Sequence, residues 1–153
     1  MLVAARNPCP CGMYPDLNKC TCSYRQIRQY NAKISRPLLD RIDINVNVQK
    51  VAYEDLLGTK KAETSAQIRK RVLAAQKIQR ERYRSESFHF NSQLDGRRTQ
   101  KYIKLGSAEE AMIRDVFEET DLSARGYNRV LKIARTIADL DGSPEIREIH
   151  LKE

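Results

Sequence analysis

Residues 7–41 read NPCPCGMYPDLNKCTCSYRQIRQYNAKISRPLLDR, and the rest of the chain is organised around this stretch. Proline, glycine, aspartate and asparagine are frequent over residues 8–22, and this composition predicts a loop. Two pairs of cysteines lie in that loop: Cys9, Cys11, Cys20 and Cys22. Four thiolates on one loop can close a tetrahedron around Zn²⁺, which prefers sulfur ligands in structural sites. The pattern therefore predicts a zinc site that fixes the loop and performs no chemistry.

The spacing within each pair leaves other states of the cysteines open. C-x-C is tighter than the common C-x₂-C knuckle, so free thiols, a redox pair or an iron–sulfur cluster are the alternatives. We see no export signal at the start of the chain, and no apolar run approaches the roughly 20 residues that cross a bilayer. We therefore expect a cytoplasmic protein with no membrane partner, in which reduced thiols favour metal binding over disulfides.

Two short apolar patterns flank the loop and predict strands. Residues 2–5 are apolar and permit a strand, and residues 42–48 alternate apolar with polar side chains, as a strand with one wet face does. The first strand has few possible neighbours in this chain, so we expect Met1 to be an internal methionine of a longer protein. Between the strands, Ser23 can cap a helix to about Lys33.

Short and long helices are expected in the rest of the chain. Pro37 suits the first turn of a short helix over 38–41. Apolar residues recur at three- and four-residue spacing in two longer helices. One is expected from Thr64 or Ser65 to about Arg84 and the other from Ser123 to Leu140. Further helices are expected over 53–57, 98–105, 107–119 and from Ser143 onward, with Ser107 and Glu110 forming a capping box.

The expected fold class is α+β and mostly α. Its 153 residues, 41% hydrophobic and 31% charged, suit one ordinary globular domain or two small ones. We expect a first domain over residues 1–52, with two strands and the cysteine-rich loop. A helical bundle over residues 53–153 would form the second domain.

The net charge of +8 is unevenly distributed. Residues 60–104 hold 13 Lys and Arg against 4 Asp and Glu, a balance of +9, so the remainder sums to −1. A concentrated basic block suits a phosphate-rich partner. A long solvated helix with a basic face is the alternative interpretation.

Three single arginines, Arg36, Arg41 and Arg125, lie in apolar surroundings. A surface ion pair, or a stem that covers apolar surface, is the ordinary interpretation of such residues. A guanidinium on a rigid element can instead stabilise the charge of a transferring phosphoryl group. The chain carries no G-x-x-x-x-G-K-[ST] phosphate loop, and neither His89 nor His150 is expected to act as a ligand or a base.

The order of the motifs is the most specific feature of the chain. An apolar segment ending in Asn-Pro, a cysteine-rich insert, SRPLLDRIDINV and SARGYNRVLKIARTIADL follow one another. This order closely resembles the magnesium-chelatase-like AAA+ ATPases, in particular the ComM/YifB group of competence-associated proteins and hexameric DNA branch-migration helicases. The resemblance covers nearly the whole chain. It implies the end of an AAA+ α/β core followed by a helical lid and C-terminal bundle.

The resemblance also implies roles for individual residues. Asn7 matches the sensor-1 residue, which positions the attacking water near the γ-phosphate of ATP. Arg41 matches the arginine finger that reaches the ATP of a neighbouring subunit, and Arg36 is a second candidate for that role. Arg125 matches the sensor-2 arginine of the lid, so that Asn7 and Arg125 would contact ATP. The cysteines match the cysteine-rich insert of the group, for which zinc is the expected ligand.

The chain departs from the family pattern in what it lacks. The Lon-protease-like domain, the Walker A loop and the Walker B acidic residues of the family are absent from these 153 residues. We therefore expect the C-terminal half of a ComM-type ATPase, which drives DNA branch migration in natural transformation and recombination. Alone it would be inactive, since ATP and Mg²⁺ would be held by the full-length protein.

Its expected partners are the N-terminal ATPase half or neighbouring subunits of a hexameric ring, together with DNA. Two alternative functions remain. The chain could be a subunit of a true magnesium chelatase, which inserts Mg²⁺ into a porphyrin, or a stand-alone zinc-bearing helical interaction module.

Overall fold

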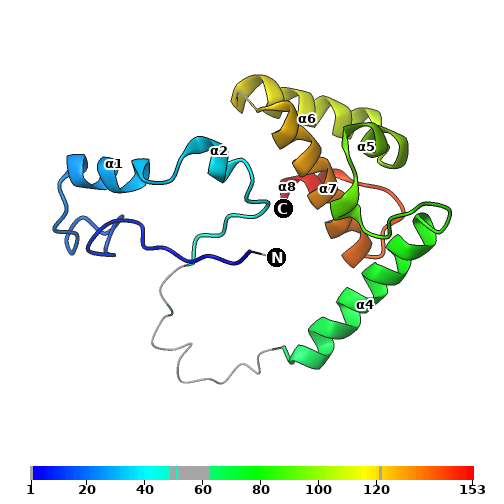
Figure 1. Cartoon of the computed structure of the whole chain (residues 1–153), viewed down its shortest axis with the longest axis horizontal. Helices are drawn as coiled ribbons and strands as arrows, with labels where there is room; N and C mark the ends of the chain where they lie inside the picture. The colour runs from blue at the N-terminus through cyan, green and yellow to red at the C-terminus, as the bar shows by residue number, and fades with distance from the viewer. Residues whose placement is uncertain (1, 49–50, 52–62, 121) are drawn as a thin grey trace. The chain divides into compact units, whose positions relative to one another are not determined.

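The computed structural model describes residues 2–48, 51, 63–120 and 122–153. The chain divides into two compact units, Met1–Ile44 and Asn45–Glu153 (Figure 1). The described residues are mostly helical. None of the described helices combines the length and the apolar character that a membrane crossing requires.

The first unit consists of the cysteine-rich loop and two helices, α1 (Tyr24–Ala32) and α2 (Arg36–Leu39). The predicted cap of α1 is confirmed. Ser23 accepts a hydrogen bond from the backbone N–H of Gln26, whose side chain accepts one in return from the N–H of Ser23. Helix α2 begins two residues earlier than expected, because the carbonyl of Ser35 accepts its first hydrogen bonds, from the N–H groups of Leu38 and Leu39.

The two predicted strands are wrong for the part of the chain that the structure describes. Residues 2–5 and 42–48 have irregular backbone, and the apolar side chains of the second segment are largely exposed, with Val46 at 75%. A strand satisfies its backbone groups by pairing with a neighbour. Residues 42–48 do alternate apolar with polar side chains, but no partner strand is present among the described residues.

The second unit is a helical bundle. It contains α4 (Ser65–Arg82), η1 (Asn91–Gln93), α5 (Gly96–Tyr102), α6 (Ser107–Thr120), α7 (Ala124–Leu140) and α8 (Glu148–Lys152). Thr64 caps α4, Asp95 caps α5 and Ser123 caps α7, each through a side-chain oxygen that accepts a backbone N–H. These polar caps satisfy donors that a helix start leaves unpaired.

Some helix boundaries differ from the prediction. Ser107 is the first residue of α6 rather than its cap, and the N–H of Glu110 donates to the Gly106 carbonyl at 2.9 Å. The last helix begins at Glu148 and not at Ser143, because the carbonyls of residues 143 and 144 are engaged by a buried arginine. The helix expected over 53–57 lies outside the described residues.

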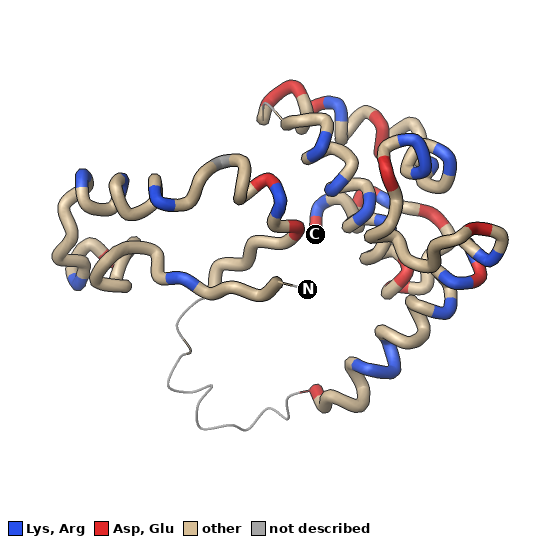
Figure 2. The backbone as a smooth tube through the Cα atoms, in the orientation of Figure 1, with Lys and Arg blue, Asp and Glu red and all other residues tan. Residues whose placement is uncertain are grey.

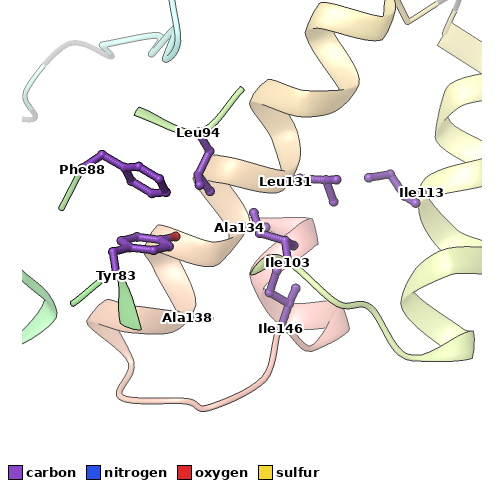
Figure 3. Packing of buried hydrophobic residues seen from close by; sticks show 9 residues of the cluster. All are labelled: Tyr83, Phe88, Leu94, Ile103, Ile113, Leu131, Ala134, Ala138 and Ile146. Carbon is purple, nitrogen blue, oxygen red and sulfur yellow. The ribbon is translucent and has the colours of Figure 1, made fainter. Parts of the chain in front are cut away.

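Helix α7 is the central element of the second unit and packs against α4, η1, α5 and α8. Its predicted apolar stripe supplies Leu131, Ala134 and Ala138 to the core. Figure 3 shows Leu131 beside Ile113 of α6. The rest of the buried cluster comes from the segments around α7: Tyr83, Phe88, Leu94, Ile103 and Ile146.

The apolar stripe predicted for α4 is buried only at its C-terminal half. Ala75 is buried, whereas Ile68 and Val72 are 44% and 40% exposed. The N-terminal half of α4 therefore presents apolar side chains to the surface of its own unit. An open hollow of about 460 Å³ lies over this face and is lined by Ser65, Ile68, Arg69, Val72, Leu73 and Gln76.

Candidate metal centre and nucleotide-sensing residues

The structure brings the four cysteines together. Their sulfur atoms all lie within 4.8 Å of one another, and the Sγ of Cys9 lies 3.4 Å from that of Cys11 and 3.8 Å from that of Cys20. Cys11 and Cys20 are 3.7 Å apart. Four sulfurs at a Zn–S distance of about 2.3 Å form a tetrahedron with edges of about 3.8 Å. The thiol positions therefore fit a tetrahedral Cys₄ site, and none of the four is in a disulfide.

Local turns aim the thiols inward. Gly12 has a φ of +79°, which favours glycine because it lies in the left-handed region, and its N–H donates to the Cys9 carbonyl at 3.1 Å. Asp16 starts a second turn, in which its carbonyl accepts the N–H of Cys20 at 2.8 Å. The second cysteine pair then leads directly into the cap of α1, so the cluster and the helix are joined without a linker.

The pKa values of the thiols are shifted in different directions. A backbone hydrogen bond from Met13, with a second hydrogen bond from Cys9, lowers the pKa of Cys11 to about 6. For Cys22, a backbone hydrogen bond from Cys11 favours the thiolate, but burial and the neighbouring thiols outweigh it and raise the pKa to about 12. A metal ion would displace the remaining protons, because thiolates and not thiols are its ligands.

The first unit has too small an apolar core to explain its fold. Among its described residues only Cys9 and Ile27 are buried. Units of about 40 residues usually need a metal, disulfides or a partner to hold together. The same four thiols that form the cluster are therefore the residues best placed to stabilise this unit.

Asn7 and Arg41 lie in the first unit, at the two ends of the stretch 7–41. Asn7 is exposed, and its side chain lies against the turn at Gly12, where an added Cβ would be 3.6 Å from its Nδ2. Arg41 is exposed as well, and its Nη1 donates to the carbonyl of Pro37 at 2.6 Å, which holds the guanidinium on α2. Arg36 is the first residue of α2.

Arg125 belongs to the second unit. It is an exposed residue in the first turn of α7, two positions after the Ser123 cap. The predicted grouping of Asn7, Arg41 and Arg125 around one nucleotide spans both units and stays a prediction. Within one unit, the sequence-predicted residues that meet are the four cysteines.

Sequence reasoning missed a buried ionic cluster in the second unit. The carboxylate of Asp139, 2% exposed, accepts hydrogen bonds from Arg82, Arg135 and Asn91. The one signal in the sequence was the four-residue spacing of Arg135 and Asp139, which puts an opposite-charge pair on one helix face. Their burial depends on residues far away in the chain and could not be deduced from that spacing.

Two family models match the chain. The magnesium chelatase subunit ChlI model covers residues 1–56, and the magnesium chelatase subunit ChlI C-terminal model covers residues 62–153. The first match contains the cysteine cluster with Asn7 and Arg41, and the second contains Arg125. Both halves of the sequence-based resemblance are therefore supported independently.

Curated relatives match along almost the whole chain. Competence protein ComM of Haemophilus influenzae is 37% identical over 153 residues, which are 99% of this chain and 29% of that protein. YifB of Salmonella typhimurium is 36% identical over 154 residues, with the same coverage of the two proteins. An uncharacterized protein of Mycobacterium tuberculosis is 34% identical over 150 residues, or 97% of this chain and 29% of its own length.

The chain spans less than a third of the length of these relatives. The C-terminal ChlI model alone covers more than half of the chain, and the second model accounts for most of the remainder. These matches, with the motif order and the cysteine cluster, lead to one assignment. The chain belongs to the magnesium-chelatase-like ChlI family and, within it, to the group that contains ComM and YifB.

Proposed function

We propose that this chain is the C-terminal part of a ComM-type, ATP-driven DNA motor and completes its ATP sites. The observation that supports this most directly is the match to both ChlI models along the chain. No G-x-x-x-x-G-K-[ST] loop occurs in these 153 residues, so the loop that cradles the phosphates would be contributed by another part of the protein. This chain would supply the residues that sense and complete the nucleotide site.

In this proposal Arg41 acts as the arginine finger. Its guanidinium is exposed and is held on α2 by the hydrogen bond to Pro37, which limits the freedom it would lose on reaching a phosphate. Arg36, at the start of the same helix, is the second candidate for this role. Asn7 would orient the attacking water, since its amide can both donate and accept hydrogen bonds.

Arg125 would act as the sensor on the lid. It lies in the first turn of α7, where the helix dipole also favours a negatively charged group. The core cluster and the buried carboxylate of Asp139 fix α7 within its unit. A rigid helix lets a guanidinium stabilise the developing charge of the γ-phosphate without reorganisation during the reaction.

The four cysteines would hold one Zn²⁺ as a structural ion. The thiol separations fit a Cys₄ tetrahedron, and softer thiolate ligands suit zinc better than Mg²⁺. The ion would supply folding energy and leave no open coordination position for chemistry. Its consequence for function would be to fix the loop between Asn7 and α1.

The basic segment 60–104 combines internal ion pairs with an exposed apolar face. Its four acidic residues, Glu63, Glu81, Glu86 and Asp95, each pair with a cation of the same segment. A further cation, Arg82, pairs with Asp139. Because Ile68 and Val72 are also exposed beside these charges, we place this segment against a neighbouring subunit of a ring.

The test is a chimera in which this chain replaces the matching segment of Haemophilus influenzae ComM. If the chain completes an ATP site, the chimera hydrolyses ATP in a DNA-dependent manner. Arg41→Ala should then lower kcat by about a thousandfold or more, as loss of an arginine finger does. Arg114→Ala, which removes an exposed arginine of α6, is the matched control and should leave the rate unchanged.

The outcome also separates the alternative functions. A chimera that folds and assembles but keeps its full rate with both Arg41→Ala and Arg125→Ala would contradict the proposed roles. Hydrolysis coupled to Mg²⁺ insertion into a porphyrin, with no response to DNA, would favour a chelatase subunit. Zinc binding without any contribution to hydrolysis would favour an interaction module.

A further inference from the structure

We propose that the exposed face of α1 binds single-stranded nucleic acid, with Arg25 and Arg28 on the phosphates and Tyr24 stacked on a base. This inference rests on the proposed function as a DNA motor and adds to it a contact surface. The surface lies on the helix that the cysteine cluster leads into, away from the basic segment 60–104 in the sequence. We call these three side chains the α1 face.

The charge around α1 is entirely positive. Residues 17–39 contain five Lys and Arg and no Asp or Glu. Figure 2 shows the basic positions along α1 with no acidic position between them. The carboxylate just before this stretch, Asp16, is engaged by Lys19 at 3.3 Å. Asp16 neutralises Lys19 but not Arg25 and Arg28, and exposed arginines of this kind attract polyanions.

The three side chains share one side of the helix. Tyr24 and Arg28 are four residues apart and Arg25 and Arg28 are three apart, which are the spacings of neighbours on a helix surface. Ile27 is the buried residue of α1, at 8% exposed, and so marks the side that faces the unit. Arg25 and Arg28 are exposed and form no ion pair with a carboxylate of the described residues.

Tyr24 differs from the other tyrosine of the helix in a way that indicates a ligand. The guanidinium of Arg6 lies 4.6 Å from the ring centroid of Tyr30 and also donates to the Tyr30 carbonyl at 3.0 Å. The ring of Tyr30 is therefore already in contact with a cation of its own unit. Tyr24 is 80% exposed, and its ring makes no stacking or cation–π contact with a described residue.

An open aromatic ring beside two unpaired guanidinium groups suits a single strand. Unstacked bases can lie on an aromatic ring whatever their sequence, while the guanidinium groups follow the backbone. A duplex keeps its bases stacked inside and would use the arginines alone. The rival surface, segment 60–104, keeps more unpaired cations, but its rings Tyr83, Phe88 and Tyr102 pack against one another. These rings are therefore not open to a base, as the ring of Tyr24 is.

The experiment measures binding of the purified 153-residue chain, loaded with zinc, to a short fluorescein-labelled oligodeoxythymidylate by anisotropy at several salt concentrations. Arg25→Gln with Arg28→Gln should reduce the slope of log K against log[salt] by about 1.4, since each phosphate contact on a single strand contributes about 0.7. Arg114→Gln with Lys152→Gln removes the same charge from the second unit and should leave the slope unchanged.

The role of the ring is tested separately. Tyr24→Ala should weaken binding about tenfold while keeping the salt slope, because it removes stacking and no charge. Tyr24→Phe keeps the ring and should bind like the parent chain. Competition by unlabelled duplex as strong as that by the single strand would overturn the assignment of a single-stranded ligand.

The results distinguish failure of this inference from failure of the proposed function. The anisotropy measurement requires no ATP, whereas the chimera tests hydrolysis. If the α1 variants bind normally and Arg69→Gln with Lys70→Gln abolishes binding, the contact lies on α4 and the α1 face is rejected while the motor function stands. If the parent chain does not bind the oligonucleotide, the α1 face is rejected, and hydrolysis by the chimera still decides the motor function.

Discussion

Arg82 donates from its Nη1 to the Oδ2 of Asp139 at 2.9 Å, and so connects α4 to α7 across 57 positions of the sequence. Its Nη2 donates to the other carboxylate oxygen, which makes the pair bidentate. Arg135 donates to the same carboxylate through Nε at 3.1 Å and to the carbonyl of Ser143 at 2.6 Å. One buried carboxylate therefore holds two helices and the segment that precedes α8.

Removing that carboxylate should strongly destabilise the second unit. Asp139→Ala leaves the guanidinium of Arg135, which is 4% exposed, without its anionic partner. Breaking a buried ion pair from one side costs about 3–5 kcal/mol, because an uncompensated charge stays buried. Urea unfolding followed by circular dichroism measures the change in free energy of unfolding.

A surface pair provides the control for this prediction. Glu81 and Arg84 are paired at 3.0 Å but both are mostly exposed, so Glu81→Ala should change the free energy of unfolding by about 0–1 kcal/mol. Equal effects of the two substitutions would show that the buried cluster does not stabilise the bundle as described.

Glu86 should make stability depend on pH in the acid range. Hydrogen bonds from Lys101, at 2.7 Å, and from Tyr102 lower the pKa of Glu86 below its usual 4.5. Since the folded pKa is the lower one, the carboxylate stabilises the fold above the unfolded pKa, and this contribution is lost as the pH falls through the folded pKa.

Glu86→Gln should therefore lower the Tm by a few degrees at most near neutral pH, because Lys101 is 63% exposed and solvent screens its pair with Glu86. The Tm values of the parent and the variant should converge below the folded pKa. Thermal melts over a series of pH values measure this. A difference in Tm that stays constant down to strong acid would contradict the assignment to the ionised carboxylate.

Removal of zinc should loosen the first unit and leave the second folded. Only Cys9 and Ile27 are buried in the described part of the first unit, whereas the second has a core of nine buried residues. Hydrogen exchange followed by mass spectrometry, before and after chelation, should show faster exchange over α1 and unchanged exchange over α7. Cys9→Ser should reproduce the effect of the chelator.

That prediction requires one zinc per chain, and metal analysis of the purified chain measures it. A protein that retains no zinc at neutral pH and shows the same exchange over α1 with and without chelator would contradict the structural role of the ion. Zinc should also be released on acidification, because protons compete with the metal for the four thiolates.

The purified 153-residue chain should not hydrolyse ATP by itself. The residues proposed to act on ATP are a sensor, an arginine finger and a lid arginine, and no phosphate-binding loop of the G-x-x-x-x-G-K-[ST] type occurs with them. A phosphate-release assay on the isolated chain should give the buffer rate. Turnover that survives further purification, and that Arg41→Ala abolishes, would contradict the proposed division of the site.

Several features were predictable from the sequence because the interactions behind them are local. Ser23, Thr64 and Ser123 each cap a helix by accepting the N–H of the residue three positions ahead. The cysteine cluster is also local, since its four ligands lie within one loop whose turns are set by Gly12 and Asp16. The prediction of an apolar stripe on α7 is confirmed for the same reason, because helical periodicity is a property of one segment.

Other features could not be predicted because they depend on which surfaces meet. The apolar alternation at 42–48 predicted a strand, yet these side chains meet no partner among the described residues. Ile68 and Val72 recur at the same helical spacing as the apolar residues of α7, but they are exposed. Periodicity shows that a face is apolar, and only packing decides whether that face is covered.

The sequence by itself determined the capped starts of α1 and α7, the four metal-binding candidates and the family to which the chain belongs. The tertiary structure decided that Asp139 is buried between Arg82 and Arg135, and that the ring of Tyr30 is occupied while that of Tyr24 is open. The physical reason is the distance along the sequence over which each kind of interaction acts. Caps, turns and closely spaced ligands act over a few residues, whereas desolvation and ion pairing depend on groups that only the folded chain brings together.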